Sequence, residues 1–238
     1  MGVVRRLAGP FGLARAAAAV DAMLNEQDRP PAEGRTAIVG EDPLRVLVVG
    51  AGTAVGYGVR TRARALDGQL AAAIAARTGR GVVVETRIRR DLRLGDTVEL
   101  LGAAGAHTFD AVVWSPTIRE VVRLQRPGAW VRAVRRILAH LRSTGTAETG
   151  VVLLGFPEVP VTNRLGELAL ERQRRVNQRI AAAASASNVR YVQPPALGGL
   201  HAERLWNAEY YERCAQAVLP MLLEVTAADR PPARATGA

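Results

Sequence analysis

A strand that runs into a glycine-rich turn, at residues 44–59 (LRVLVVGAGTAVGYGV), constrains this chain more than any other stretch. Residues 46–49 are apolar and mostly β-branched, which is typical of a strand buried on both faces of a parallel sheet. Glycines at positions 50, 52, 56 and 58 allow positive φ and leave backbone N–H groups uncovered. From about Tyr57 the pattern becomes helical. Because such a turn favours an anion or oxyanion, we expect the functional cleft here.

The rest of the chain alternates apolar runs with helical spacing. We expect further strands at 82–88, 109–114, 151–154 and 189–192, and helices from about 57 to 78 and at 95–101, 127–141, 165–184 and 207–224, the last kinked at Pro220. This alternation predicts a three-layer α/β/α fold, with a flavodoxin-like five-stranded parallel sheet. In such folds ligands bind outside the carboxyl ends of the strands.

The sequence divides into three parts. Residues 1–43 are predicted to be a basic N-terminal segment and linker, with the linker at 28–35; residues 44–225 form one domain, and 226–238 a disordered tail. Arg15 and the Gly9-Pro10 pair interrupt what resembles a signal peptide, so we expect a cytoplasmic protein. Residues 1–24 could contact a membrane as an amphipathic helix, but packing on their own domain is more common.

Composition argues against several classes of function. The formal charge is +10, yet every basic residue is Arg, these are spread along the chain, and aromatic residues make up 4%, which argues against nucleic-acid binding. Cys214 is the only cysteine, so an internal disulfide and a multi-thiolate metal site are excluded. His107, His140 and His201 lie far apart, so we expect no metal and no cofactor. The oligomeric state is left open.

Four segments follow the expected strands in order: GAGTAVGYGV from Gly50, LGDTVELL from Leu94, WSPTIREVVRL from Trp114 and GFPEVP from Gly155. In order and spacing they resemble the sequence blocks of the SGNH/GDSL hydrolase superfamily. The resemblance covers about residues 44–223 and implies an esterase or acylhydrolase lineage with a flavodoxin-like three-layer fold. A last block would lie around residues 198–207.

The catalytic positions of that family carry other residues here. The resemblance places the nucleophilic serine at Gly52, the preceding aspartate at Ala51 and the oxyanion-hole asparagine at Arg119, whose block has Thr117 in place of its glycine. Glycine offers no attacking oxygen. Of the oxyanion donors, only Gly95 is retained, with the Gly52 amide still available.

The last block has two possible registers. A literal reading of GGLH puts His201 at the histidine and Gly198 at the aspartate. A register fixed by the apolar face of the following helix puts Leu205 and Ala202 there instead, and we prefer it. The nucleophile is missing in either register.

The leading hypothesis is therefore a catalytically inactive member that keeps the cleft and binds a small acyl or anionic ligand. The Arg119 guanidinium would favour a carboxylate, phosphate or sulfate, unless it pairs with Glu120 or Glu158 at the rim. The expected ligand-binding residues are Gly50, Gly52, Thr53, Gly95, Trp114 and Arg119.

An active ester hydrolase with a rearranged site is the first alternative. Thr53 would be its nucleophile, His201 its base, and Glu203 or Asp110 the orienting acid. The objection is that the side chain next to the usual nucleophile in a tight turn points elsewhere.

A nucleotide-binding Rossmann-like domain is the second alternative. Gly50, Gly52 and Gly56 form a G-x-G-x-x-x-G pattern after a strand, and Glu85 could bind a ribose. The spacing of this pattern differs by one residue from the dinucleotide fingerprint.

Overall fold

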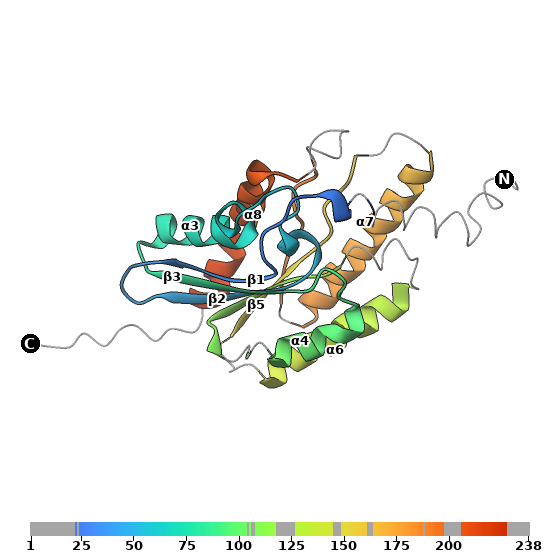
Figure 1. Cartoon of the computed structure of the whole chain (residues 1–238). Coiled ribbons are helices and arrows are strands. Elements are labelled where there is room, and N and C mark those ends of the chain that lie inside the picture. The colour runs from blue at the N-terminus through green and yellow to red at the C-terminus, as the bar shows by residue number, and fades with distance from the viewer. Residues whose placement is uncertain are drawn as a thin grey trace, which may run out of the picture.

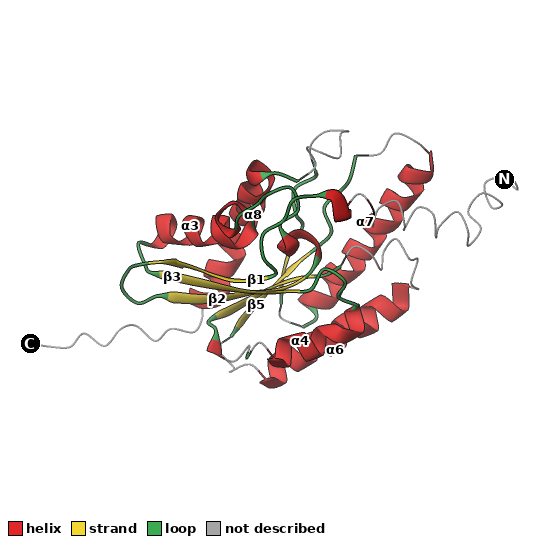
Figure 2. Cartoon of the chain, in the orientation of Figure 1, coloured by secondary structure: helices red, strands yellow, loops and turns green. Residues whose placement is uncertain are grey.

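The computed structural model describes residues 22, 24–103, 105, 108–117, 127–144, 149–160, 164–187, 189–197 and 206–227. A central sheet lies between two layers of helices (Figure 1), and the strands gather in the middle of the molecule (Figure 2). The strands are β1 (Glu33–Ile38), β2 (Leu44–Gly50), β3 (Val82–Ile88), β4 (Ala111–Ser115), β5 (Gly150–Leu154) and β6 (Arg190–Val192). Their order in the sheet is β1-β3-β2-β4-β5-β6, and only the β1–β3 pair is antiparallel. The expected three-layer α/β fold is confirmed.

The helices cover both faces of the sheet. One layer consists of α3 (Leu66–Thr78) and α8 (Ala208–Ala227), and the other of α4 (Thr97–Ala103), α6 (Pro127–Thr144) and α7 (Arg164–Ser185). Short 3₁₀ helices η1 (Gly52–Val55), η2 (Arg62–Arg64) and η3 (Leu94–Asp96) lie in the connecting loops. Among the described helices, none combines the length and apolar character that crossing a membrane requires.

The central strands are buried on both faces, as the apolar run of β2 indicates. Val46 and Val48 pack toward α3 and α8, whereas Leu47 and Val49 pack toward α4, α6 and α7. All four side chains have zero exposed area. The loops that follow the carboxyl ends of β2, β4 and β5 therefore begin at a rigid, closely packed part of the sheet.

The sheet contains a sixth strand that we did not expect. The predicted linker at 28–35 overlaps β1, which pairs with β3 at the edge of the sheet from Glu33 opposite Arg87 to Ile38 opposite Val82. Its residues alternate between exposed and half-buried, and none is fully buried. An edge strand of this kind lacks the apolar run that identified the other strands, which explains the error.

The glycine-rich turn also differs from the expectation. The helix predicted from about Tyr57 begins only at Leu66, and η1 ends in a left-handed Gly56 with φ of 83°. Gly58, with φ of 76°, is a second left-handed residue in the same stretch. Two positive φ values so close together cannot be part of an α-helix, so residues 56–61 form a loop. At the other end of the chain, α8 continues to Ala227, past the expected end at 224.

Candidate functional site

The turn after β2 lies directly against the end of β4. Gly50 has φ of 121°, and a Cβ added to it would lie 2.1 Å from the carbonyl oxygen of Ser115. The next residue, Ala51, donates its N–H to the same oxygen at 2.8 Å. Only glycine permits this approach of two backbones at position 50.

Gly52, the position of the family's serine, is closed to side chains. Its φ is 56°, and a Cβ built there would lie 2.5 Å from the carbonyl oxygen of Pro116, a backbone atom. A real Cβ essentially never comes that close to another heavy atom. Residue 52 therefore carries no nucleophile, and no serine fits without a shift of the β4 loop.

Ser115 places a hydroxyl beside this corner that sequence analysis missed. Its Oγ lies 3.4 Å from the position of a Cβ at Gly52, and the residue is 1% exposed. Within the part of the chain that the structure describes, this Oγ has no hydrogen-bond partner. A buried polar group of this kind calls for a ligand or water oxygen. The sequence signal was a serine that directly follows the apolar run of residues 111–114, at the end of β4.

Thr53 points toward α8. Its hydroxyl lies 3.4 Å from the hydroxyl of Tyr210, and Thr53 is 3% exposed. Burial raises the pKa of Tyr210 well above its ordinary value, and it raises the pKa of the Cys214 thiol to about 12. Both groups are therefore protonated at neutral pH, so neither can take a proton from Thr53 as a base.

The loop after β5 forms the opposite wall and is held by amide side chains. The Asn177 side chain accepts the N–H of Phe156 at 2.9 Å and donates to the carbonyl oxygen of Phe156 at 2.9 Å. Gln193 donates to the same oxygen at 2.8 Å, and Gln173 donates to the carbonyl oxygen of Pro157. The loop is thereby fixed against α7.

A small pocket lies between the corner and this loop. Its volume is about 20 Å³, which is room for about one water molecule. The corner contributes Gly52, Thr53 and Pro116, and the remaining lining residues are Leu24, Tyr57, Gly155, Phe156, Pro157 and Trp206. Gly52 and Thr53 were expected at the site, whereas Leu24 and Trp206 were not.

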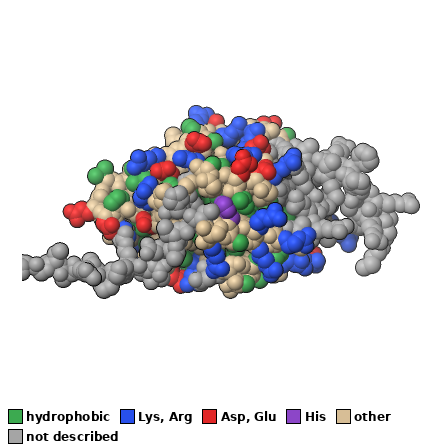
Figure 3. Space-filling model, turned by 90° about the horizontal axis from the view of Figure 1, so that it is seen from below, with side chains coloured by type: hydrophobic (Ala, Val, Ile, Leu, Met, Phe, Trp, Pro, Cys, Tyr) green, Lys and Arg blue, Asp and Glu red, His purple; other side chains and the backbone are tan. Residues whose placement is uncertain are grey.

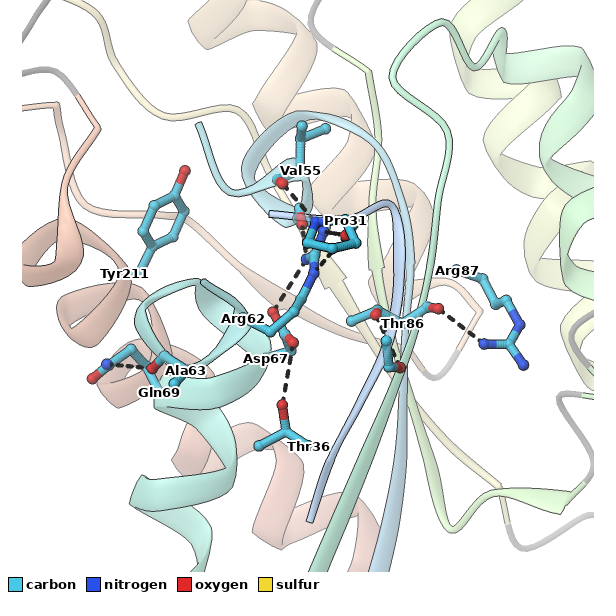
Figure 4. A network of polar contacts seen from close by, with 12 residues as sticks. Pro31, Thr36, Val55, Arg62, Ala63, Asp67, Gln69, Thr86, Arg87 and Tyr211 are labelled. Atoms are coloured by element: carbon cyan, nitrogen blue, oxygen red, sulfur yellow. Dashed lines mark hydrogen bonds and ion pairs between the residues drawn. The ribbon is translucent and has the colours of Figure 1, made fainter. Parts of the chain in front are cut away.

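Arg62 joins the corner to the chain that precedes β1 (Figure 4). Its guanidinium donates to the carbonyl oxygens of Pro31 at 2.8 Å and Ala54 at 3.3 Å, and it pairs with Asp67 at 3.3 Å. The side chains of Arg62 and Asp67 are only 11% and 1% exposed. Burial raises the pKa of Asp67, and the Arg62 charge opposes this rise. A buried pair of this kind fixes the loop before α3 relative to η1.

Glu158 lies at the rim and is already paired. Arg174 donates from Nε to one carboxylate oxygen at 2.8 Å and from a terminal nitrogen to the other at 2.6 Å. This hydrogen bonding lowers the pKa of Glu158. Both of its oxygens are engaged, which disfavours Glu158 as the partner suggested for Arg119. Arg119 and Glu120 themselves lie outside the described residues.

Three of the expected ligand-binding residues are not in the lining of the pocket. Gly50 packs against the Ser115 backbone instead. Trp114 has zero exposed area and belongs to the apolar cluster that faces α6 and α7. Gly95 lies in η3, is exposed, and has open space around the position of a Cβ. Neither residue is in the lining of the pocket.

Of the alternative catalytic residues, the structure describes Thr53 and Asp110, and these two lie at opposite ends of the strands. Asp110 precedes β4 and accepts the N–H of Arg45 at 2.7 Å. It lies at the amino-terminal ends of the strands, opposite the pocket. It therefore cannot orient a base beside Thr53, and that assignment is wrong. His201 and Glu203 lie outside the described residues, as do Gly198, Ala202 and Leu205 of the last block. Glu85, the candidate ribose ligand, pairs with Arg87 at 3.5 Å.

Charged groups on the described surface form pairs rather than metal clusters. On the face in Figure 3, arginine side chains lie in several groups with acidic side chains among them. Within the residues that the structure describes, no group of three or more His, Cys, Asp or Glu is arranged to hold a metal ion.

Comparison with known proteins places this fold. No family model matches the chain, and no curated protein matches it in sequence. Among solved structures it is similar to TesA, with 19% identity and a TM-score of 0.59 over 76% of this chain and 99% of that chain. It is also similar to a carbohydrate esterase family 2 enzyme from Corynascus thermopiles (Myceliophthora fergusii), with 13% identity and a TM-score of 0.64 over 80% of this chain and 68% of that chain.

A third similar structure is Est24, a carbohydrate acetylesterase from Sinorhizobium meliloti, with 13% identity and a TM-score of 0.61 over 76% of this chain and 99% of that chain. These neighbours have the SGNH hydrolase fold. The chain therefore has the SGNH hydrolase fold, as its sequence blocks predict.

Proposed function

We propose that this chain is a ligand-binding protein of the esterase/acylhydrolase lineage that keeps the cleft of the SGNH fold and has lost acyl transfer. The observation that carries this proposal is the closed corner, where the Pro116 carbonyl oxygen takes the space that a side chain at residue 52 would need. Loss of a triad nucleophile removes several orders of magnitude in rate and leaves only what binding and the oxyanion hole supply.

The lining of the pocket supports an acyl group as one part of the ligand. Tyr57, Phe156 and Trp206 are each at most 6% exposed and present apolar surface to the pocket. Tyr57 and Trp206 lie with their ring centroids 5.7 Å apart. An alkyl chain is the group that such walls bind best.

A polar head group on the ligand is supported by the corner itself. The Ser115 hydroxyl is buried without a described partner next to the Gly52 turn, and a ligand oxygen would satisfy it. Arg119 follows Thr117 by two residues in the sequence. We keep our expectation that its guanidinium favours a carboxylate or another small anion.

Calorimetric titration with a matched ligand pair tests the proposal. Hexanoate and hexanamide share the alkyl chain and differ in charge, and inorganic phosphate carries charge without the chain. We expect hexanoate to bind most tightly, and Arg119→Ala to reduce its affinity to that of hexanamide. Arg142→Ala, which removes an exposed arginine on α6, is the control and should change nothing. Failure of all three ligands to bind, or turnover of a hexanoyl ester, would contradict the proposal.

An active hydrolase with rearranged residues remains the second candidate. The observation in its favour is that two hydroxyls, those of Thr53 and Ser115, lie at the corner. A covalent serine-hydrolase probe would label whichever of them attacks, and substitution of that residue by alanine would abolish the label.

A further inference from the structure

A short N-terminal segment that precedes β1 contributes a side chain to the pocket. We call residues 24–31 the N-terminal strap. Only Leu24 and Pro30 within it are buried, whereas the residues between them are exposed or half-buried. The strap therefore lies on the surface and inserts one apolar side chain at its start.

Leu24 forms part of the wall of the candidate site. It is 2% exposed and lines the same pocket as Gly52, Tyr57 and Trp206. Its isobutyl group packs in the apolar cluster that contains both aromatic residues. Because the remaining volume is about 20 Å³, an alkyl chain cannot enter while Leu24 is in place.

Hydrogen bonds and an ion pair attach the C-terminal end of the strap, residues 28–31, to the domain. Gly58 donates its N–H to the carbonyl oxygen of Asp28 at 2.8 Å, and Arg60 pairs with the Asp28 carboxylate at 2.9 Å. Arg62 donates to the carbonyl oxygen of Pro31 at 2.8 Å, and a Cβ at Gly56 would lie 3.0 Å from the Pro30 ring. Among the described residues, every hydrogen bond between the strap and the domain involves residue 28 or 31.

Among the described residues, no hydrogen bond joins residues 24–27 to the domain, and Leu24 is their buried contact with it. The hydrogen bonds described there join Arg29 to the carbonyl oxygens of Asn25 and Gln27, within the strap. Arg29 belongs to the anchored part at 28–31, so these two exposed bonds, at 3.3 and 3.4 Å, would break when residues 24–27 move away. The anchors at 28–31 would act as a hinge.

We propose that Leu24 is the intramolecular occupant of the acyl pocket, and that a ligand's alkyl chain binds by displacing residues 24–27 about the anchors at 28–31. This inference rests on the proposed function, because it assumes that the pocket takes an acyl group. The ligand then binds only the fraction of molecules in which the strap is open, so its apparent affinity is reduced by that fraction.

Hydrogen exchange on the full-length protein tests the displacement directly. Saturating hexanoate should speed exchange of the amides in residues 24–27 while it slows exchange in residues 52–57. Exchange at Asp28 and Arg29 should change little, because the anchors remain; Pro30 and Pro31 carry no amide hydrogen. Binding of hexanoate with unchanged or slower exchange at residues 24–27 would overturn the strap proposal and leave the proposed function intact.

A matched pair of leucine substitutions provides the second measurement. Leu24→Ala removes the occupant and should raise the affinity for hexanoate about tenfold. Leu44→Ala truncates an equally buried leucine at the start of β2, remote from the pocket lining, and should leave the affinity unchanged. Equal affinity in Leu24→Ala and the wild type would overturn the strap proposal alone. No binding by either protein would overturn the proposed function and the strap proposal with it.

Discussion

The corner after β2 and the loop after β5 both border the pocket, but different kinds of contact hold them. At the corner, Gly50 and Gly52 bring one backbone against another, at the carbonyl oxygens of Ser115 and Pro116. At the β5 loop, the side chains of Asn177, Gln173 and Gln193 bind the backbone of residues 156–157.

Under the proposed function, this difference explains how the shape of the cleft could be kept without acyl transfer. The shape of the corner depends on the absence of side chains, so the loss of a nucleophile leaves its backbone path intact. The shape of the β5 loop depends on side chains that are present. We therefore expect the corner to be damaged by added atoms and the loop by removed ones.

The largest effect is expected from Gly50→Ala. Positive φ and a Cβ 2.1 Å from the Ser115 oxygen should together lower the free energy of unfolding by about 4 kcal/mol. Gly52→Ala, with its contact at 2.5 Å, should cost slightly less. Urea denaturation provides the measurement.

Gly79→Ala is the matched control for these two substitutions. Gly79 has φ of 68° but nothing within 4 Å of the Cβ position, so it isolates the strain of positive φ, about 1 kcal/mol. If Gly52→Ala proved no worse than Gly79→Ala, the corner would have room for a side chain, and the contrast between the two walls would disappear.

Arg62→Met should have the next largest effect, because Arg62 is the side-chain support of the corner. Its removal leaves the Asp67 carboxylate buried without its cation and should cost about 3 kcal/mol. Arg60→Met is the control, since its pair with Asp28 is exposed at 83% and 56% and should contribute less than about 1 kcal/mol. Similar costs for the two variants would mean that backbone contacts alone hold the corner.

Asn177→Leu tests the other wall. The substitution removes two hydrogen bonds to the Phe156 backbone and leaves a buried N–H unsatisfied, at a cost of about 2 kcal/mol. Gln193→Leu should cost less, because the Phe156 carbonyl oxygen keeps the bond from Asn177. Thermal denaturation of both variants compares them. A harmless Asn177→Leu would show that the loop does not need its amides.

The smallest expected effect is on the pH dependence of the free energy of unfolding. Because burial raises the pKa of Asp67 above 3.8, the native state binds this proton more tightly than the unfolded state. The Asp67 contribution to stability is thus present below its unfolded pKa and is lost as pH rises through its folded pKa. Unfolding measured from neutral pH down to about pH 4 should show wild type gaining stability relative to Asp67→Asn. Parallel curves would contradict this.

The fold could be predicted from the sequence because buried parallel strands consist of apolar runs. Sequence reasoning located the corner through the glycines at 50 and 52; the loss of a catalytic nucleophile there stays a prediction. It missed β1, because an exposed edge strand has no apolar run. It assigned a helix from Tyr57 because periodicity does not reveal positive φ at Gly56 and Gly58.

The pocket itself was harder to predict. A single leucine such as Leu24 carries no local signal that it lines the same pocket as Trp206, which is far away in the sequence. Trp114 lies at the end of a strand and was expected to contact ligand, but its ring packs under the sheet instead. Which face a side chain takes at the end of a strand depends on the twist and register of its neighbours, and these are tertiary properties.

The proposal that the corner lacks a nucleophile is tested most directly by labelling the full-length protein with a fluorophosphonate probe, followed by peptide mass spectrometry. We predict no adduct on any residue of the corner in the wild type. In Gly52→Ser we expect no additional adduct, other than on residues that a shift of the β4 loop exposes. A stoichiometric adduct on Ser115 or Thr53 in the wild type, abolished when that residue is changed to alanine, would contradict the account.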